Sequence, residues 1–166
     1  LVAYSGDDSR FEYIYKYVSS SPYAANADGS LLDDGTLYVA RFNADGSGDW
    51  LALKFGENGL TPENGFASQA DVLVNTRLAA DHVGATKMDR PEWGAVDPKS
   101  GAVYFTLTNN SKRSLAQVDP ANPRAVNIFG QIIRWNEDGE GHGGTRFTWD
   151  LFVLAGDKAQ SRTFAG

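Results

Sequence analysis

Residues 84–93, which read Gly-Ala-Thr-Lys-Met-Asp-Arg-Pro-Glu-Trp, place two acids, two bases, a proline and a tryptophan within ten positions. Pro91 fixes its own φ and disfavours the helical region for Arg90, which predicts a stiff, extended corner. Because residues two apart in an extended chain point to the same side, Arg90 and Glu92 are expected to share one face. A guanidinium fork beside a carboxylate suits an anion held next to a metal ion. A loop salt bridge explains the same spacing, and spacing alone favours it.

Two acids and two amides elsewhere could also bind an ion. Asp7 and Asp8 follow a glycine, and they suit either a hard-cation site or the turn that ends a strand. Asn109 and Asn110 follow a predicted strand directly and offer oxygens and amides at its end. Both asparagines tolerate left-handed backbone, so turn formation is the simpler account of that pair.

Arg124 repeats the pairing of an arginine with a proline, because it follows Pro123 directly. Loop pinning and ligand contact are equally open for it. If the two proline–arginine loops are neighbours in the fold, Arg90 and Arg124 are expected to approach one anion.

Other familiar site patterns are weak or missing. Residues 43–49 place oxygen ligands at alternate positions, but an EF-hand needs a glutamate where this chain has Lys54, so a hairpin turn is the better account. His82 and His142 belong to no zinc-binding spacing, and we interpret both as incidental. Neither a serine-hydrolase elbow nor a phosphate-binding P-loop occurs in the sequence.

The elements that must hold these residues are mostly strands. Residues 11–18 alternate, with Phe11, Tyr13, Tyr15 and Tyr17 expected on one side. Further strands are predicted at residues 1–4, 36–42, 50–53, 93–96, 102–108, 130–135 and 146–154. The helical spacing of residues 67–83 predicts one helix, with a break left open, and residues 109–127 predict a long ordered loop. The fold class is therefore all-β, a partial β-propeller of about two to three blades with one short helix, and a sandwich is the competing architecture.

Composition limits the class of function. The chain has 166 residues, with 42% hydrophobic and 12% aromatic content, which are values of a globular protein. A formal net charge of −6 argues against a nucleic-acid partner. Apolar runs are far too short for a membrane span, and the sequence contains no cysteine for a disulfide or a thiolate. An acidic protein that processes anions needs locally concentrated positive charge, from arginines or from metal ions.

Seven motifs in order resemble the PhoX family of bacterial alkaline phosphatases. They occupy residues 4–16, 35–42, 45–50, 84–93, 108–111, 122–125 and 149–157. One departure is Gln131, where the family often has histidine. The resemblance implies a six-bladed propeller, calcium and iron as cofactors, a phosphate ester as substrate, and export to the periplasm or medium by the twin-arginine route. It also implies that Glu92 is a metal ligand and that Arg90 binds phosphate, with Asn109, Asn110 and Arg124 as weaker candidates.

The chain is expected to be an internal fragment, a single partial domain over residues 1–166, because it begins inside a predicted strand without a methionine. The family pattern supplies a cysteine and a second glutamate ligand from upstream segments, so the fragment is expected to be inactive alone. Its partners would then be the remaining blades of the parent chain. Two alternatives stay open, namely a non-catalytic extracellular scaffold or binding module and a related calcium-dependent esterase or lactonase.

Overall fold

The computed structural model describes residues 1–24, 26–139, 141–156 and 164–165, so Asp157, the last residue of the seventh motif, lies outside them. The strands are β1 Val2–Gly6, β2 Arg10–Glu12, β3 Ile14–Ser19, β4 Gly35–Phe42, β5 Ser47–Ala52, β6 Met88–Asp89, β7 Pro91–Val96, β8 Val103–Leu107, β9 Gln131–Glu137, β10 Arg146–Leu154 and β11 Phe164–Ala165. The helices are α1 Gln69–Val74 and α2 Thr76–His82, with short 3-10 turns η1 Gly29–Leu32, η2 Pro62–Asn64 and η3 Leu115–Gln117.

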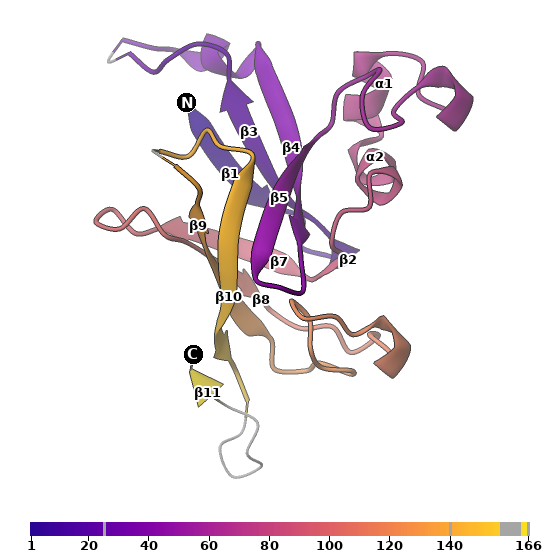
Figure 1. Cartoon of the computed structure of the whole chain (residues 1–166), viewed down its shortest axis with the longest axis vertical. Helices are drawn as coiled ribbons and strands as arrows, with labels where there is room; N and C mark the ends of the chain where they lie inside the picture. The colour runs from indigo at the N-terminus through magenta and orange to yellow at the C-terminus, as the bar shows by residue number, and fades with distance from the viewer. Residues whose placement is uncertain (25, 140, 157–163, 166) are drawn as a thin grey trace.

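One curved antiparallel sheet contains nine of these strands, in the order β1-β3-β4-β5-β10-β9-β8-β7, with β11 on β10. It consists of two four-stranded meanders that are joined where β5 pairs with β10 (Figure 1). The free edges β1 and β7 also meet, and a side chain at Gly6 would collide with the Pro91 carbonyl. The sheet therefore nearly closes on itself. The all-β prediction is confirmed, with the curvature of a propeller or barrel wall.

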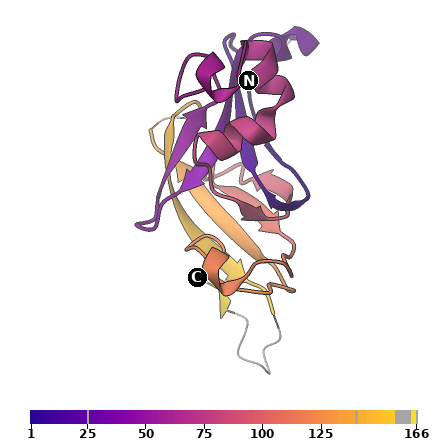
Figure 2. The ribbon, with the colours of Figure 1, turned by 90° about the vertical axis from the view of Figure 1, so that its right-hand side faces the viewer.

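The two faces of the sheet bury separate cores because strand side chains alternate. The inner face is aromatic, and Trp135, Phe105, Phe147, Trp50 and Phe42 are its largest members. The outer face of β3, β4 and β5 packs against the helices, which lie on one side of the sheet (Figure 2). The inner core thus fixes how β5 and β10 meet, and the helices cover only one meander.

The predicted helix is present in two pieces. The Ser68 hydroxyl accepts from the Asp71 backbone N–H and so caps α1. Asn75, which has φ −104° and ψ 38°, ends α1 and precedes α2. Val72, Ala79 and Ala80 are the fully buried contacts of this pair with the sheet. The break that the sequence left open therefore lies at Asn75.

The strand predicted over residues 11–18 is wrong at its start. Phe11 has φ +65° and is the extra residue of a bulge in β2, which pairs with β6 instead of continuing into β3. Tyr13 and Tyr15 do lie together in the helix-covered core. Phe11 leaves that face, and its ring lies 5.0 Å from the Arg113 guanidinium carbon. Alternation could not reveal a bulge of this kind, because the second ribbon depends on residues 88–89.

Residues 43–46 form the tight connection between β4 and β5, residues 47–49 begin β5, and the Asp45 carboxylate accepts from the Ser47 N–H at 2.9 Å. The hairpin interpretation of this segment is therefore confirmed. Within the described part of the chain, no helix has the length and apolar character needed to cross a membrane.

Candidate functional site

Arg90 lies at a sharp corner between the two-stranded ribbon and the large sheet. Asp89 pairs with β2, and Pro91 pairs with Leu107 of β8. The chain changes sheets within one residue, and Arg90 takes φ +54° to do so. Its carbonyl accepts from the Thr108 N–H at 3.2 Å. The extended geometry predicted for Arg90 is therefore wrong, because the left-handed conformation needed by the turn outweighs the preference imposed by the proline.

Glu92 is the extra residue of a second bulge. The register of β7 on β8 shifts between Pro91 and Trp93, which leaves Glu92 between the paired positions. The Glu92 side chain is exposed and, among the described residues, has no hydrogen-bond or ion-pair partner. Arg90 lies at a corner and Glu92 is a bulge residue, so the rule that residues two apart in an extended chain share a face does not apply to this pair.

Asp8 meets Arg90 across this corner. The Nη2 nitrogen of Arg90 lies 2.9 Å from Asp8 Oδ1 and 3.0 Å from Oδ2, and the two side chains are 31% and 42% exposed. The Nε and Nη1 donors of Arg90 have no partner among the residues described here. Asp7 is exposed and its carbonyl accepts from the Ser9 N–H, which is a strand-ending turn. Asp8 therefore orients one side of the fork and leaves the other side open.

The two asparagines after β8 differ in setting. Asn110 is fully buried and exchanges two backbone hydrogen bonds with Asn127, at 2.6 and 3.1 Å. Its side-chain oxygen accepts from the Lys112 N–H. Asn109 is half-buried at the strand end. The Asn110 side-chain oxygen therefore serves the loop, whereas its amide nitrogen is buried without a hydrogen-bond partner among the described residues.

Arg124 holds the backbone near the corner. Its guanidinium donates to the Ala155 carbonyl at 2.6 Å and to the Gly130 carbonyl. Gly130, with φ +75°, packs directly against the carbonyls of Leu107 and Thr108. Thr108 in turn bonds the Arg90 backbone. The two proline–arginine segments are thus linked indirectly, through Gly130 and Thr108.

A buried polar cluster behind the corner was missed by sequence reasoning. Asp89 is fully buried and Arg113 is 2% exposed, with Arg113 Nε 2.7 Å from Asp89 Oδ1. The other Asp89 oxygen accepts from Asn127 at 3.0 Å, and Gln131 accepts from the same Asn127 amide at 2.5 Å. In the sequence, Arg113 is an arginine in a polar loop, and such residues are commonly solvated, so its residue type and position gave little sign of a buried cluster.

The described residues contain no group of three histidine, aspartate or glutamate side chains able to hold a metal ion. His142 bonds the Tyr4 hydroxyl at 2.8 Å, and His82 packs beside Phe66 with ring centroids 6.0 Å apart. Calcium takes six to eight oxygen ligands, so the exposed Glu92 carboxylate fits as one ligand of such a site and not as a whole site.

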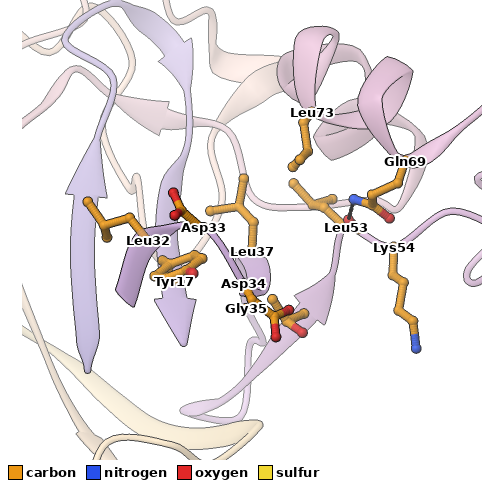
Figure 3. Close-up of a pocket in the computed structure, with 11 residues that line it drawn as sticks. Tyr17, Leu32, Asp33, Asp34, Gly35, Leu37, Leu53, Lys54, Gln69 and Leu73 are labelled. Atoms are coloured by element: carbon orange, nitrogen blue, oxygen red, sulfur yellow. Dashed lines mark hydrogen bonds between the residues drawn. The ribbon is translucent and has the colours of Figure 1, made fainter. Parts of the chain in front are cut away.

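A groove of about 590 Å³ lies elsewhere, between η1, β4 and α1 (Figure 3). Leu32, Leu73 and the acids Asp33 and Asp34 line it, and Gln69 closes one side by donating to the Leu53 carbonyl at 3.0 Å. None of the predicted site residues lines this groove. The corner at Arg90 is therefore separate from it.

The sheet is all-β with the curvature of a propeller or barrel wall, and Arg90 lies where the chain passes from the two-stranded ribbon into it. The profile of the family "Alkaline phosphatase PhoX" matches residues 1–166, and the chain belongs to this family. The PhoX of Pseudomonas fluorescens, solved in complex with vanadate, a transition state analogue, is 50% identical with a TM-score of 0.89. That match covers 95% of this chain and 30% of the other, so this chain spans about 30% of its length. No curated protein matched.

Proposed function

We propose that this chain is one partial domain of a secreted or periplasmic phosphatase that hydrolyses phosphate monoesters at a centre of calcium and iron. Family membership and the 50% identity to a protein solved with vanadate support the proposal. In this proposal Arg90 binds the phosphate, Glu92 is a metal ligand, and the other ligands come from further segments of the parent. The chain alone then lacks a complete site.

The observation that carries the proposal is the open side of the Arg90 fork. A phosphate monoester presents two or three oxygens in the geometry that a guanidinium matches with paired N–H groups. Asp8 contacts only Nη2, and the Arg90 side chain is 31% exposed. A surface salt bridge needs no such strained backbone, and strain of this kind is characteristic of functional sites.

The residues present assign a limited share of the chemistry to this chain. Arg90 orients the phosphoryl group and offsets charge that develops on its oxygens. In this proposal Asp8 orients the guanidinium, and Asn109, at the end of β8, adds a neutral amide contact. A bound metal would supply the larger charge neutralisation, and Glu92 would hold it.

The test uses the full-length enzyme and p-nitrophenyl phosphate. Arg90→Ala should lower kcat/KM by about 10²–10³, the usual effect of losing one group that stabilises transition-state charge. Arg90→Lys should recover part of this, because it restores charge without the fork. Glu92→Gln should weaken metal binding, measured as metal content after dialysis. Arg41→Lys is the control, because it makes the same replacement in an exposed ion pair with Asp49. It should leave kcat/KM and metal content unchanged.

Turnover that is unaffected by chelation of calcium and iron, or by Arg90→Ala, would refute the proposal. A lactone assayed in parallel separates phosphatase from lactonase chemistry, since hydrolysis of the lactone alone would favour the latter.

A further inference from the structure

Arg113 uses its whole guanidinium inside the protein. Nε pairs with Asp89 at 2.7 Å, Nη1 donates to the Gln117 carbonyl at 2.6 Å, and Nη2 donates to the Lys87 carbonyl at 2.7 Å. The side chain is 2% exposed, so no substrate can reach it. Arg113 therefore acts on its protein neighbours alone.

Two of those neighbours, Lys87 and Asp89, lead into the corner. Lys87 and Asp89 flank Met88 in β6, which pairs with β2 through only two residue pairs. A ribbon this short is marginal by itself. Since Arg113 binds the Lys87 carbonyl and the Asp89 carboxylate together, it fixes the backbone immediately before Arg90.

Backbone strain gathers around the same residue, Arg113. Among the described residues, four that are not glycine have positive φ, and three of these adjoin the cluster: Phe11 at +65°, Arg90 at +54° and Val126 at +47°. The Phe11 ring lies against Arg113, and the Val126 N–H donates to the Arg113 carbonyl at 2.8 Å. Such conformations persist only when surrounding contacts over-determine them. Arg113 supplies a contact to each of these three segments.

We propose that Arg113, acting through Asp89, is a positioning residue for the phosphate-binding corner and sets the direction of the Arg90 guanidinium. The inference rests on the proposed function, because it concerns the same corner. A lysine at position 113 keeps the charge but cannot reach Asp89, Lys87 and Gln117 at once in a planar fork.

The test measures p-nitrophenyl phosphate kinetics and inhibition by vanadate in the full-length enzyme. Arg113→Lys should lower kcat/KM and weaken vanadate inhibition by about 10–100-fold, the effect of a small displacement of a binding group. Arg134→Lys is the matched control, because Arg134 pairs with Asp150 on β9 and β10 at a partly exposed site. Leu60→Ala is the stability control, because Leu60 is fully buried in the helix-covered core. Both controls should change vanadate inhibition less than about twofold at 25 °C, because substitutions at distant sites without shared partners act nearly independently.

Phe11→Leu serves as a milder second variant, since it removes only the ring beneath the Arg113 guanidinium. It should also weaken vanadate inhibition, but less than Arg113→Lys does. If Arg113→Lys and Phe11→Leu leave vanadate inhibition unchanged, or if Leu60→Ala weakens it equally, the positioning role is refuted. Arg90→Ala in the same experiment separates the two proposals. An effect of Arg90→Ala without an effect of Arg113→Lys removes the positioning role only, whereas no effect of either removes the corner as a phosphate site.

Discussion

Replacing Lys16 with methionine should destabilise the fold strongly, because it leaves Glu137 as a buried carboxylate without a cation. Lys16 is fully buried, and its ammonium uses all three donors. They reach Glu137 Oε2 at 2.9 Å, the Gly144 carbonyl at 2.6 Å and the His142 carbonyl at 3.1 Å. The Glu137 side chain is 2% exposed. Methionine fills similar space but offers none of these bonds.

Removing one partner of a buried ion pair costs about 3–5 kcal/mol. At about 2–4 °C per kcal/mol for a chain of this size, the melting temperature should fall by about 6–20 °C. Arg41→Met is the matched control on the neighbouring strand, because it breaks an Arg41–Asp49 pair with side chains that are 44% and 24% exposed. That change should cost at most about 1 kcal/mol.

The assay is thermal and urea unfolding of the single variants and of Lys16→Met combined with Glu137→Gln. Burial lowers the pKa of Lys16, although the Glu137 carboxylate opposes the shift. For the Lys16 ammonium, the cost of burial therefore outweighs the attraction to Glu137. The double variant, which has neither charge, should recover most of the stability that Lys16→Met loses. Glutamine also keeps an acceptor for the Tyr4 hydroxyl and the Trp50 indole N–H. A loss below about 1 kcal/mol in Lys16→Met, the range of exposed pairs, would refute the reasoning, as would a double variant no better than the single one.

Three further predictions concern backbone, pH and activity. Gly130→Ala should lower the free energy of unfolding more than Gly56→Ala does. Both glycines have positive φ, but only a side chain at Gly130 would meet backbone carbonyls, and Gly56→Ala should cost about 1–2 kcal/mol. Equal urea midpoints for the two variants would contradict this prediction. Burial raises the pKa values of Tyr4, Tyr13 and Tyr15 above the usual 10.0, so above about pH 10 the unfolded chain loses protons that the folded chain keeps. The free energy of unfolding should therefore fall as pH rises through this range, and a urea midpoint that stays constant to about pH 11 would argue against it. The 166-residue chain alone, supplied with calcium and iron, should show no turnover of p-nitrophenyl phosphate in the usual range of about 1–10³ s⁻¹, and turnover in that range would contradict an incomplete site.

Much of the secondary structure could be predicted from local pattern. The strands predicted over residues 36–42 and 146–154 and the helical spacing of residues 67–83 each correspond to elements in the structure. These signals are local, because side chains two apart in a strand or three to four apart in a helix share a face. Residues 11–18 were predicted less well, because the bulge at Phe11 depends on a partner strand far along the chain.

In the candidate site, too, the residues could be chosen from local pattern, whereas their backbone geometry could not. Arg90 and Glu92 were singled out from residue type, spacing and family motifs, and their roles stay predictions. The backbone at Arg90 was predicted wrongly, since a local rule about the residue before proline cannot know that Asp89 and Pro91 pair with strands of different sheets.

The sequence by itself determined most of the strand and helix content, the acidic net charge and the family. Only the tertiary structure decided how residues 84–93 are held, because Arg113, Asn127 and Asp8 reach this segment from other loops. Pairing across such separations depends on the closed path of the sheet, which no local periodicity encodes. Spacing alone favoured a loop salt bridge between Arg90 and Glu92, but among the described residues Arg90 pairs with Asp8 instead, and one side of its guanidinium stays open.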